Sequence, residues 1–214
     1  MARLRVGVLI SGRGSNLKAL IDAAADPAYP AEIVLVISNR PEAPGLAHAA
    51  RAGIDRRAIG EPSRKLFAAE ADAALRQGGV ELVALAGFMR ILDTAFVETW
   101  RDRLVNIHPS LLPAFPGLHP QRQALAAGVR FSGCTVHFVR AQVDTGPIIA
   151  QAVVPVHPQD DEALLSERIL AAEHRLYPMA VHLFAEGRLS IRDDRVAISG
   201  AVPPEIALYN PVGG

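Results

Sequence analysis

Short apolar runs alternate with helix-like segments along the first hundred residues of the chain. Three apolar runs bounded by glycine or polar residues are typical of strands, at 4–10, 32–38 and 80–86, and residues 54–59 are a further candidate strand. Helical spacing of apolar residues separates them, at 17–25, 44–52 and 63–77. Because these strands show little alternation between apolar and polar positions, we expect helices to cover both faces. This half is therefore predicted to be a Rossmann-like parallel sheet.

The pattern changes after residue 100. A short strand at 103–107 enters a proline-rich loop at 108–120, and a short helix follows at 120–127. Strands at 132–139 and 147–156 are predicted to pair antiparallel, before a long amphipathic helix at 160–186. The tail suits a small hairpin, at 188–191 and 195–199, with fraying at 209–214. The predicted class is α/β: a mostly parallel twisted sheet with helices on both faces, antiparallel additions in the C-terminal half, a long C-terminal helix and a hairpin.

Length and composition favour one well-packed domain. The chain has 214 residues, 50% of them hydrophobic and 21% charged, which is enough to bury a full core without disulfides. We expect a single domain over residues 1–214, with a Rossmann-like half at 1–100 and a second half at 101–214. The one cysteine, Cys134, lies in an apolar stretch and is interpreted as a buried small hydrophobe.

Charge and hydropathy exclude several classes of partner. Lys plus Arg and Asp plus Glu both number 22, so the formal net charge is zero, whereas nucleic-acid binders usually carry a basic excess. The start of the chain lacks the features of a signal peptide, and no window of about 20 uncharged apolar residues could span a membrane. We therefore expect a cytoplasmic protein with small-molecule partners, and neither nucleic acid nor membrane.

A glycine-rich loop, Gly12-Arg-Gly-Ser-Asn16, follows the first strand and opens a helix. Free backbone N–H groups and the helix dipole make such a position suitable for binding an anion. Leu17 stands where a dinucleotide-binding G-x-G-x-x-G motif needs glycine, and no Gly-Lys-Ser/Thr follows to make a P-loop. The loop is interpreted either as a site for a single phosphate or as a tight turn with an Asn or Ser cap.

A second segment, 85–92, ends an apolar strand at Gly87 and continues with Met89, Arg90, Ile91 and Leu92. Glycine permits the close approach of a ligand or of another backbone segment. An apolar rim with one arginine suits a flat heteroaromatic group. The alternative interpretation is ordinary core with a surface arginine.

The segment richest in chemistry runs from Asn106 to His119. If 103–107 is a strand, Asn106 and His108 project to the same side, because side chains alternate with a period of two. Three prolines stiffen the loop that follows. A positioned histidine can move a proton, and an asparagine amide can donate to an oxyanion, so the pair suits acyl transfer. The alternative is that both side chains satisfy loop carbonyls.

Two acidic residues further along the chain are open to more than one interpretation. Asp144, in Asp-Thr-Gly-Pro147, is either a turn former or a carboxylate that orients His108 and favours its charged form. Glu173 is either solvated on a helix face or reaches a substrate hydroxyl or amine. No metal site is predicted, because His, Cys and carboxylate residues lack ligand spacing. No serine lies in a G-x-S-x-G elbow, so a covalent serine is not predicted either.

Together these segments resemble the glycinamide ribonucleotide formyltransferase family. The matching stretches keep the family's order and spacing across nearly the whole chain: 9–17, 85–92, 106–113 with 115–119, 144–147, and 173–174 with 177–178. The resemblance implies transfer of a formyl group from the co-substrate 10-formyltetrahydrofolate to the amine of glycinamide ribonucleotide in purine synthesis, without a metal. The expected assembly is a monomer or a homodimer.

The same resemblance implies roles for particular residues. Asn106 and His108 would stabilise a tetrahedral oxyanion, His108 would take part in proton transfer, and Asp144 would support protonated His108. The ribonucleotide would be held at its phosphate by Gly14, Ser15 and Asn16, at its ribose by Glu173, and elsewhere by Pro109 and Leu170. The folate would be held by Arg64, Met89, Arg90, Ile91, Leu92, Asn106, Arg140, Ala141, Gln142, Val143 and Asp144.

Other formyl-folate enzymes share the core of Asn106, His108 and Asp144. Methionyl-tRNA formyltransferase carries an additional C-terminal domain and formyltetrahydrofolate deformylase an additional N-terminal domain, neither of which we expect in this chain. The Pro-Gly-Leu-His block at 116–119 also favours the ribonucleotide transferase. A non-catalytic nucleotide- or folate-binding module would keep the glycine loop but would not need the three core residues together.

Overall fold

A computed structural model of the chain describes residues 2–202 and 205–211. Its main sheet has seven strands in the order β3-β2-β1-β4-β5-β6-β7. The parallel strands are β1 (Leu4–Ile10), β2 (Ala31–Ser38), β3 (Asp55–Ala58), β4 (Leu82–Leu85) and β5 (Leu104–His108). Strand β6 (Phe131–Phe138) pairs antiparallel with both β5 and β7 (Ile148–Pro155). A separate hairpin, β8 (Leu189–Arg192) and β9 (Arg195–Ile198), follows, and the predicted fold class is confirmed.

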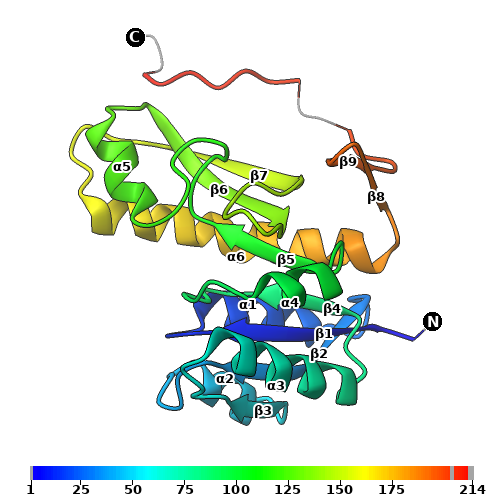
Figure 1. The fold of residues 1–214 in the computed structure, drawn as a ribbon. Coiled ribbons are helices and arrows are strands. Elements are labelled where there is room, and N and C mark those ends of the chain that lie inside the picture. Colours follow the sequence, from blue (N-terminus) through cyan, green and yellow to red (C-terminus); the bar gives the residue numbers. More distant parts are fainter. Residues whose placement is uncertain (1, 203–204, 212–214) are drawn as a thin grey trace.

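Helices cover both faces of the sheet (Figure 1). On one face α1 (Ser15–Ala24), α2 (Leu46–Arg51), α5 (Pro120–Ala126) and the long α6 (Glu162–Ala185) share one buried apolar cluster with the strands. On the other face α3 (Arg64–Gln77) and α4 (Thr94–Thr99) form a second cluster. Helix α6 crosses the sheet between α1 and the β6–β7 pair. The Tyr177 hydroxyl lies 3.0 Å from the Leu85 carbonyl and 3.2 Å from that of Val105, which anchors α6 to the centre of the sheet.

Alternation along each strand divides its side chains between the two clusters. In β5, Val105 and Ile107 pack in the cluster of α6, whereas Leu104 packs in the cluster of α3 and α4. Asn106 and His108 therefore belong to the face of α3 and α4. Cys134 is fully buried on the α6 face, as predicted.

Helix α4 is an element that the sequence pattern did not predict. Asp93 caps it by accepting a hydrogen bond from Ala95 N at 2.9 Å. Buried Phe96 and Trp100 hold it against α3, and Trp100 Nε1 donates to Asp72 Oδ1 at 2.9 Å. Six residues are fewer than two helical turns, so tertiary contacts rather than a periodic pattern define this helix.

The prediction of fraying at 209–214 is wrong for Asn210. Its side-chain amide donates to the carbonyls of Arg130 and Val156, at the end of the β6–β7 pair. Residues 212–214 lie outside the described residues.

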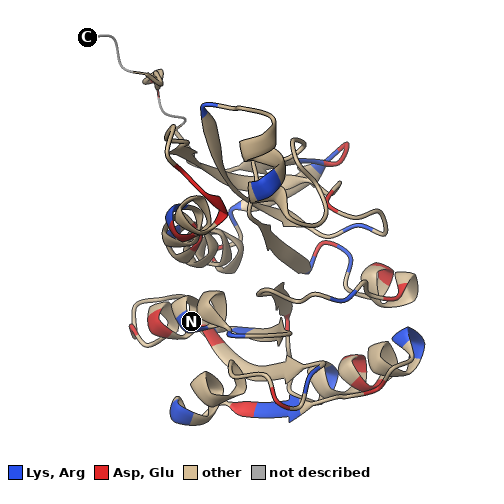
Figure 2. Cartoon of the chain, turned by 90° about the vertical axis from the view of Figure 1, so that its left-hand side faces the viewer, with Lys and Arg blue, Asp and Glu red and all other residues tan. Residues whose placement is uncertain are grey.

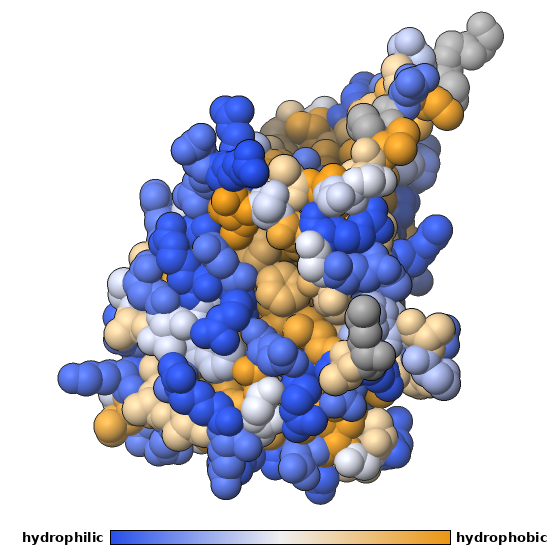
Figure 3. All heavy atoms as spheres, turned by 90° about the vertical axis from the view of Figure 1, so that its right-hand side faces the viewer, coloured by the Kyte–Doolittle hydropathy of each residue, from blue (hydrophilic) through white to orange (hydrophobic). Residues whose placement is uncertain are grey.

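Charged residues of both signs are spread over the fold (Figure 2). Lys and Arg are interspersed with Asp and Glu (Figure 2), in keeping with a formal net charge of zero. The face shown in Figure 3 has a central band of apolar side chains bordered by hydrophilic ones. Within residues 2–202 and 205–211, no helix combines the length and apolarity needed to cross a membrane.

Candidate active site

Asn106 and His108 lie at the C-terminal end of β5. Both follow Leu104 at two-residue intervals, so the three side chains share one face of the sheet, as the strand period predicts. Leu104 is fully buried, Asn106 is half-buried and His108 is 6% exposed. Parallel pairing places Asn106 beside Leu85 of β4, so the end of β4 adjoins the same site.

The His108 ring lies between two acceptor oxygens. Its Nδ1 is 3.4 Å from Asp144 Oδ2, and its Nε2 is 3.0 Å from the Phe115 carbonyl oxygen. Asp144 has a φ of 56°, and its Oδ2 also accepts a hydrogen bond from Gly117 N at 2.8 Å. The His108 and Asp144 side chains are 8% and 9% exposed, so bulk water screens their contact little. The structure thus brings the two residues together, and Asp144 does more than form a turn.

His137 is a neighbour of this pair that the sequence did not point to. It lies opposite Asn106 in the antiparallel β5–β6 ladder, with its Nε2 3.2 Å from Asn106 Nδ2 and 3.8 Å from Asp144 Oδ1. Burial lowers the pKa of His137 below its usual 6.5. Its Nδ1 is 2.9 Å from the Phe138 carbonyl, so a neutral ring donates there and accepts the Asn106 amide at Nε2. This contact fixes the direction of the Asn106 amide.

In the sequence, His137 belongs to the histidines that lack metal-ligand spacing, and no other motif singles it out. Knowledge of the register between β5 and β6 would have revealed this contact, because that register places His137 opposite Asn106. A shift by one residue would turn His137 to the other face, and the sequence alone did not fix this register. In the described part of the chain, no three His, Cys, Asp or Glu side chains are grouped so that they could share a metal ion.

The loop after β5 is held by hydrogen bonds to β6. Thr135 Oγ1 donates to the Ser110 carbonyl at 2.7 Å and accepts from Leu112 N at 3.0 Å. Ser110 Oγ donates to the Ala114 carbonyl at 2.6 Å. Half-buried Pro109 lies in the same loop. These bonds hold the loop that presents the Phe115 carbonyl to His108.

The glycine loop packs tightly against the start of α2. Gly14 has a φ of 72° and forms the N-cap of α1 without any side-chain cap, so the alternative of an Asn or Ser cap is wrong. A Cβ at Gly14 would lie 2.8 Å from the Gly45 Cα, and Gly45 N donates to the Gly12 carbonyl at 3.0 Å. The first turn of α1 is left without a side-chain acceptor for its N–H groups, while phosphate binding there stays a prediction.

Asn16 and Glu173 form a buried contact between α1 and α6. Asn16 Nδ2 donates to Glu173 Oε2 at 2.7 Å, and Glu173 is 5% exposed. Burial raises the pKa of Glu173 from 4.5 to about 7, although the hydrogen bond from Asn16 acts in the opposite direction. Asn16 Oδ1 is buried without a partner, and half-buried Leu170 lies one turn earlier on α6. Glu173 is therefore not solvated on a helix face.

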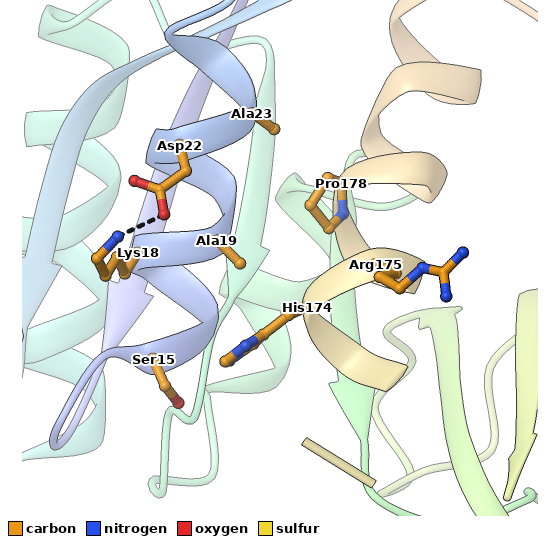
Figure 4. Close-up of a pocket in the computed structure, with 8 residues that line it drawn as sticks. All are labelled: Ser15, Lys18, Ala19, Asp22, Ala23, His174, Arg175 and Pro178. Atoms are coloured by element: carbon orange, nitrogen blue, oxygen red, sulfur yellow. Dashed lines mark hydrogen bonds and ion pairs between the residues drawn. The ribbon is translucent and has the colours of Figure 1, made fainter. Parts of the chain in front are cut away.

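A cavity of about 440 Å³ opens between α1 and α6, next to the glycine loop (Figure 4). Ser15 and Lys18 line it from α1, and His174 and Arg175 line it from α6. Lys18 pairs with Asp22, whereas His174 turns its ring towards α1 and its buried Nε2 has no partner. Asp22 also lines the cavity and offsets the charge of Lys18, and burial lowers the pKa of His174. The Arg175 guanidinium and the Ser15 hydroxyl, at the N-terminus of α1, are the lining groups whose chemistry suits an anion.

The segment after β4 presents apolar side chains to solvent. Met89 and Ile91 are 73% and 59% exposed, which excludes ordinary core for these two, while Leu92 packs partly against the second cluster. The Arg90 guanidinium donates to the carbonyls of Glu61 and Pro62 and lies 5.1 Å from the centre of the Phe67 ring. Arg64 is exposed at the nearby start of α3.

Residues 140–143, which the resemblance assigns to the folate, consist of one ion-paired arginine and three exposed residues. The Arg140 guanidinium forms ion pairs with Asp102 and Asp194. The next three residues, Ala141, Gln142 and Val143, are exposed.

Comparisons with known proteins agree with the resemblance found in the sequence. The sequence matches the family described as Formyl transferase over residues 4–181. A phosphoribosylglycinamide formyltransferase of Escherichia coli (strain K12) is 42% identical over 206 residues, covering 94% of this chain and 97% of that protein. The trifunctional purine biosynthetic protein adenosine-3 of Drosophila pseudoobscura pseudoobscura is 57% identical over 192 residues. That match covers 87% of this chain and only 14% of the longer protein.

Solved structures agree with this pattern. Glycinamide ribonucleotide transformylase 1 from Symbiobacterium toebii matches with a TM-score of 0.88 and 52% identity, covering 92% of this chain and 94% of that one. A formyltetrahydrofolate deformylase from Pseudomonas syringae pv. tomato matches with a TM-score of 0.86 and 26% identity, covering 66% of that chain. The chain therefore belongs to the formyl transferase family, and the resemblance seen in the sequence is confirmed. Within the family, the Escherichia coli and Symbiobacterium toebii proteins are similar to it over nearly their whole lengths, and both names refer to formyl transfer onto glycinamide ribonucleotide.

Proposed function

We propose that the protein transfers the formyl group of 10-formyltetrahydrofolate to the amine of glycinamide ribonucleotide. The observation that carries this proposal is the contact of His108 with Asp144 beside Asn106, at the end of β5. A binding module without catalysis would have no need of this grouping. The similarity to the Escherichia coli formyltransferase along nearly its whole length supports the choice of substrates.

The proposed reaction is direct acyl transfer. The amine nitrogen forms a bond to the formyl carbon, the bond from that carbon to N10 of the folate breaks, and the proton lost by the amine ends on N10. Asn106 and His108 stabilise the oxyanion of the tetrahedral intermediate, and His108 also moves the proton. For both tasks His108 Nε2 exchanges its contact with the Phe115 carbonyl for one with the substrate. Asp144, 3.4 Å from His108 Nδ1, supports the protonated ring. His137 accepts one Asn106 N–H, and the amide keeps its second N–H for the oxyanion.

The ribonucleotide is proposed to bind between α1 and α6. Its phosphate accepts hydrogen bonds from the backbone N–H groups of Gly14, Ser15 and Asn16, and Arg175 lines the neighbouring cavity. Its ribose hydroxyls donate hydrogen bonds to Glu173, which in the structure accepts one from Asn16. Pro109 and Leu170 are proposed to border this site.

The folate is proposed to lie against the exposed apolar side chains of Met89 and Ile91, next to Arg64, Arg90 and Leu92. Residues 141–144 complete this side of the site, and Ala141, Gln142 and Val143 contact the ligand mainly through their backbone. This arrangement suits a flat heteroaromatic group, which gains affinity from apolar contact and orientation from a few polar groups.

Hydrolysis of the formyl donor is a second candidate, because the Pseudomonas syringae deformylase has nearly the same fold. Single-turnover mixing of the protein with 10-formyltetrahydrofolate and glycinamide ribonucleotide separates the two. We expect formylated ribonucleotide and tetrahydrofolate in equal amounts. Formate without formylated ribonucleotide would mean that the chain is a hydrolase and that the proposal is wrong.

A further inference from the structure

Arg140 stands at the start of the loop that carries Asp144. Its Nη2 is 2.8 Å from Asp102 Oδ1 and 2.9 Å from Asp194 Oδ1, and its Nε is 3.1 Å from the same Asp194 oxygen. The Arg140 side chain is only 9% exposed, whereas those of Asp102 and Asp194 are 47% and 56% exposed. A guanidinium so nearly buried is screened less than one in an exposed ion pair.

The three residues come from three separate segments of the chain. Asp102 lies between α4 and β5, Arg140 follows β6, and Asp194 lies in the turn of the β8–β9 hairpin. We call Arg140, Asp102 and Asp194 the ionic cluster. The hairpin begins at residue 189, beyond the part that matches the formyl transferase family, which ends at residue 181. The cluster therefore ties a peripheral element to the loop of the active site.

The side chain of Arg140 also lies against the other end of this loop. A Cβ on Gly146 would lie 3.3 Å from Arg140 Cγ and 1.7 Å from the Phe138 carbonyl oxygen. Phe138 N donates to the Pro147 carbonyl at 2.9 Å, which closes the base of the loop. Between these points Asp144, with its φ of 56°, reaches His108 and Gly117. Movement of Arg140 would therefore move the base on which Asp144 is presented.

We propose that Arg140 is a positioning residue. The β8–β9 hairpin, through Asp194, holds Arg140 and so holds the 140–146 loop in the conformation that presents Asp144 to His108 and the loop backbone to the folate. The inference rests on the proposed function, because it takes Asp144 as part of the active site. It assigns to Arg140 an action through the loop rather than a direct ion pair with the folate.

Two substitutions separate these roles. Arg140→Met keeps most of the side-chain stem and removes the charge, while Asp194→Asn removes the carboxylate and keeps a residue that tolerates the observed φ of 56°. Asp193→Asn is the matched control, since Asp193 is in the same turn with a φ of 49° and lies outside the ionic cluster. If Arg140 paired directly with folate, Asp194→Asn would leave the KM for formyl-folate unchanged or lower it.

We expect Arg140→Met and Asp194→Asn each to raise the KM for 10-formyltetrahydrofolate about fivefold, with the KM for the ribonucleotide unchanged. The double variant should be no worse than Arg140→Met alone, because that substitution already removes the contact of Arg140 with Asp194 together with the one to Asp102. Amide hydrogen exchange at residues 141–146 should quicken in both variants and stay at the wild-type rate in Asp193→Asn.

Unchanged exchange and unchanged KM in Asp194→Asn would overturn the inference, as would equal effects of Asp193→Asn. A merely structural role would lower the melting temperature and the active fraction without shifting one KM alone. If the wild-type protein formylates no ribonucleotide, the proposed function fails, and the exchange rates still report whether the hairpin holds the loop.

Discussion

At the scale of single residues, the direction of the Asn106 amide depends on a neighbour. The neutral ring of His137 accepts from Asn106 Nδ2, and the low pKa that burial gives this histidine keeps it an acceptor. An asparagine amide without such a partner can rotate and offer its oxygen instead of its N–H groups. His137 therefore orients the amide that would stabilise an oxyanion.

We predict that replacing His137 changes turnover more than binding. His137→Phe keeps a ring and removes the acceptor, so kcat should fall about tenfold, as expected for a misdirected oxyanion donor that retains some function. His137→Gln offers an amide oxygen as acceptor and should recover part of the loss. Steady-state kcat and KM for both substrates measure this. Equal kcat values for the two variants would contradict the role given to the acceptor.

Glu173 should make stability depend on pH. Burial raises its pKa from 4.5 to about 7, so the folded protein holds the proton more tightly than the unfolded chain does. This contribution to stability is fully present below pH 4.5 and is lost as the pH rises towards 7. At about 1.4 kcal/mol for each pKa unit, the loss is on the order of 3 kcal/mol.

Glu173→Gln should remove this dependence, because the amide does not ionise. Urea unfolding at pH 5 and pH 8 measures it in both proteins. The free energy of unfolding of the wild type should fall relative to that of Glu173→Gln as the pH rises. Parallel changes in the two proteins would show that Glu173 is not the group that titrates.

The sequence predicted part of the site at this scale, for reasons that can be named. Asn106 and His108 share a face because strand alternation is local. The contact of His108 with Asp144 depends on how the β6–β7 pair folds back over β5, and the pairing of Asn106 with His137 depends on register. Both contacts are long-range, and neither follows from residue spacing.

At the scale of elements, the glycine loop and α1 form one unit with the start of α2. Gly14 combines a positive φ with contact against Gly45, whereas Gly53 has a φ of 67° and no heavy atom within 4 Å of a Cβ built there. Both glycines have a left-handed backbone conformation, but only at Gly14 would an added Cβ meet a neighbouring atom.

We predict that Gly53→Ala lowers the free energy of unfolding by about 1 kcal/mol, the strain of a left-handed residue. Gly14→Ala should lower it more, because the new Cβ would lie 2.8 Å from Gly45 Cα, and should also raise the KM for the ribonucleotide. Thermal unfolding and steady-state kinetics measure both effects. A similar change in KM for the two variants would show that the glycine loop has no specific part in binding the ribonucleotide.

Element prediction succeeded where the sequence carries a local signal and failed where it does not. Most strands of the main sheet and the 24-residue helix α6 follow from apolar runs and periodicity, and the six-residue α2 was predicted as well, whereas β3 is exposed and charged. Helix α4 has six residues, and its position depends on Phe96 and Trp100 packing against the second cluster. Phe96 and Trp100 are buried by long-range packing, so the local sequence shows little helical periodicity.

At the scale of the whole molecule, the candidate site forms where distant segments meet. The ends of β4 and β5, the loop after β6 and the middle of α6 contribute to it, so no single stretch of sequence contains it. The fold class and the family are confirmed, while the single-domain boundaries and a monomeric or homodimeric state stay predictions.

The central claim is that His108, set between Asp144 and the Phe115 carbonyl, carries out formyl transfer. The most direct test is the single-turnover rate of formylated ribonucleotide formation by His108→Ala, with both substrates saturating. The rate should fall at least about a hundredfold while both ligands still bind, the usual loss when an oxyanion or proton-transfer group is removed. Transfer at the wild-type rate in this variant would contradict the account.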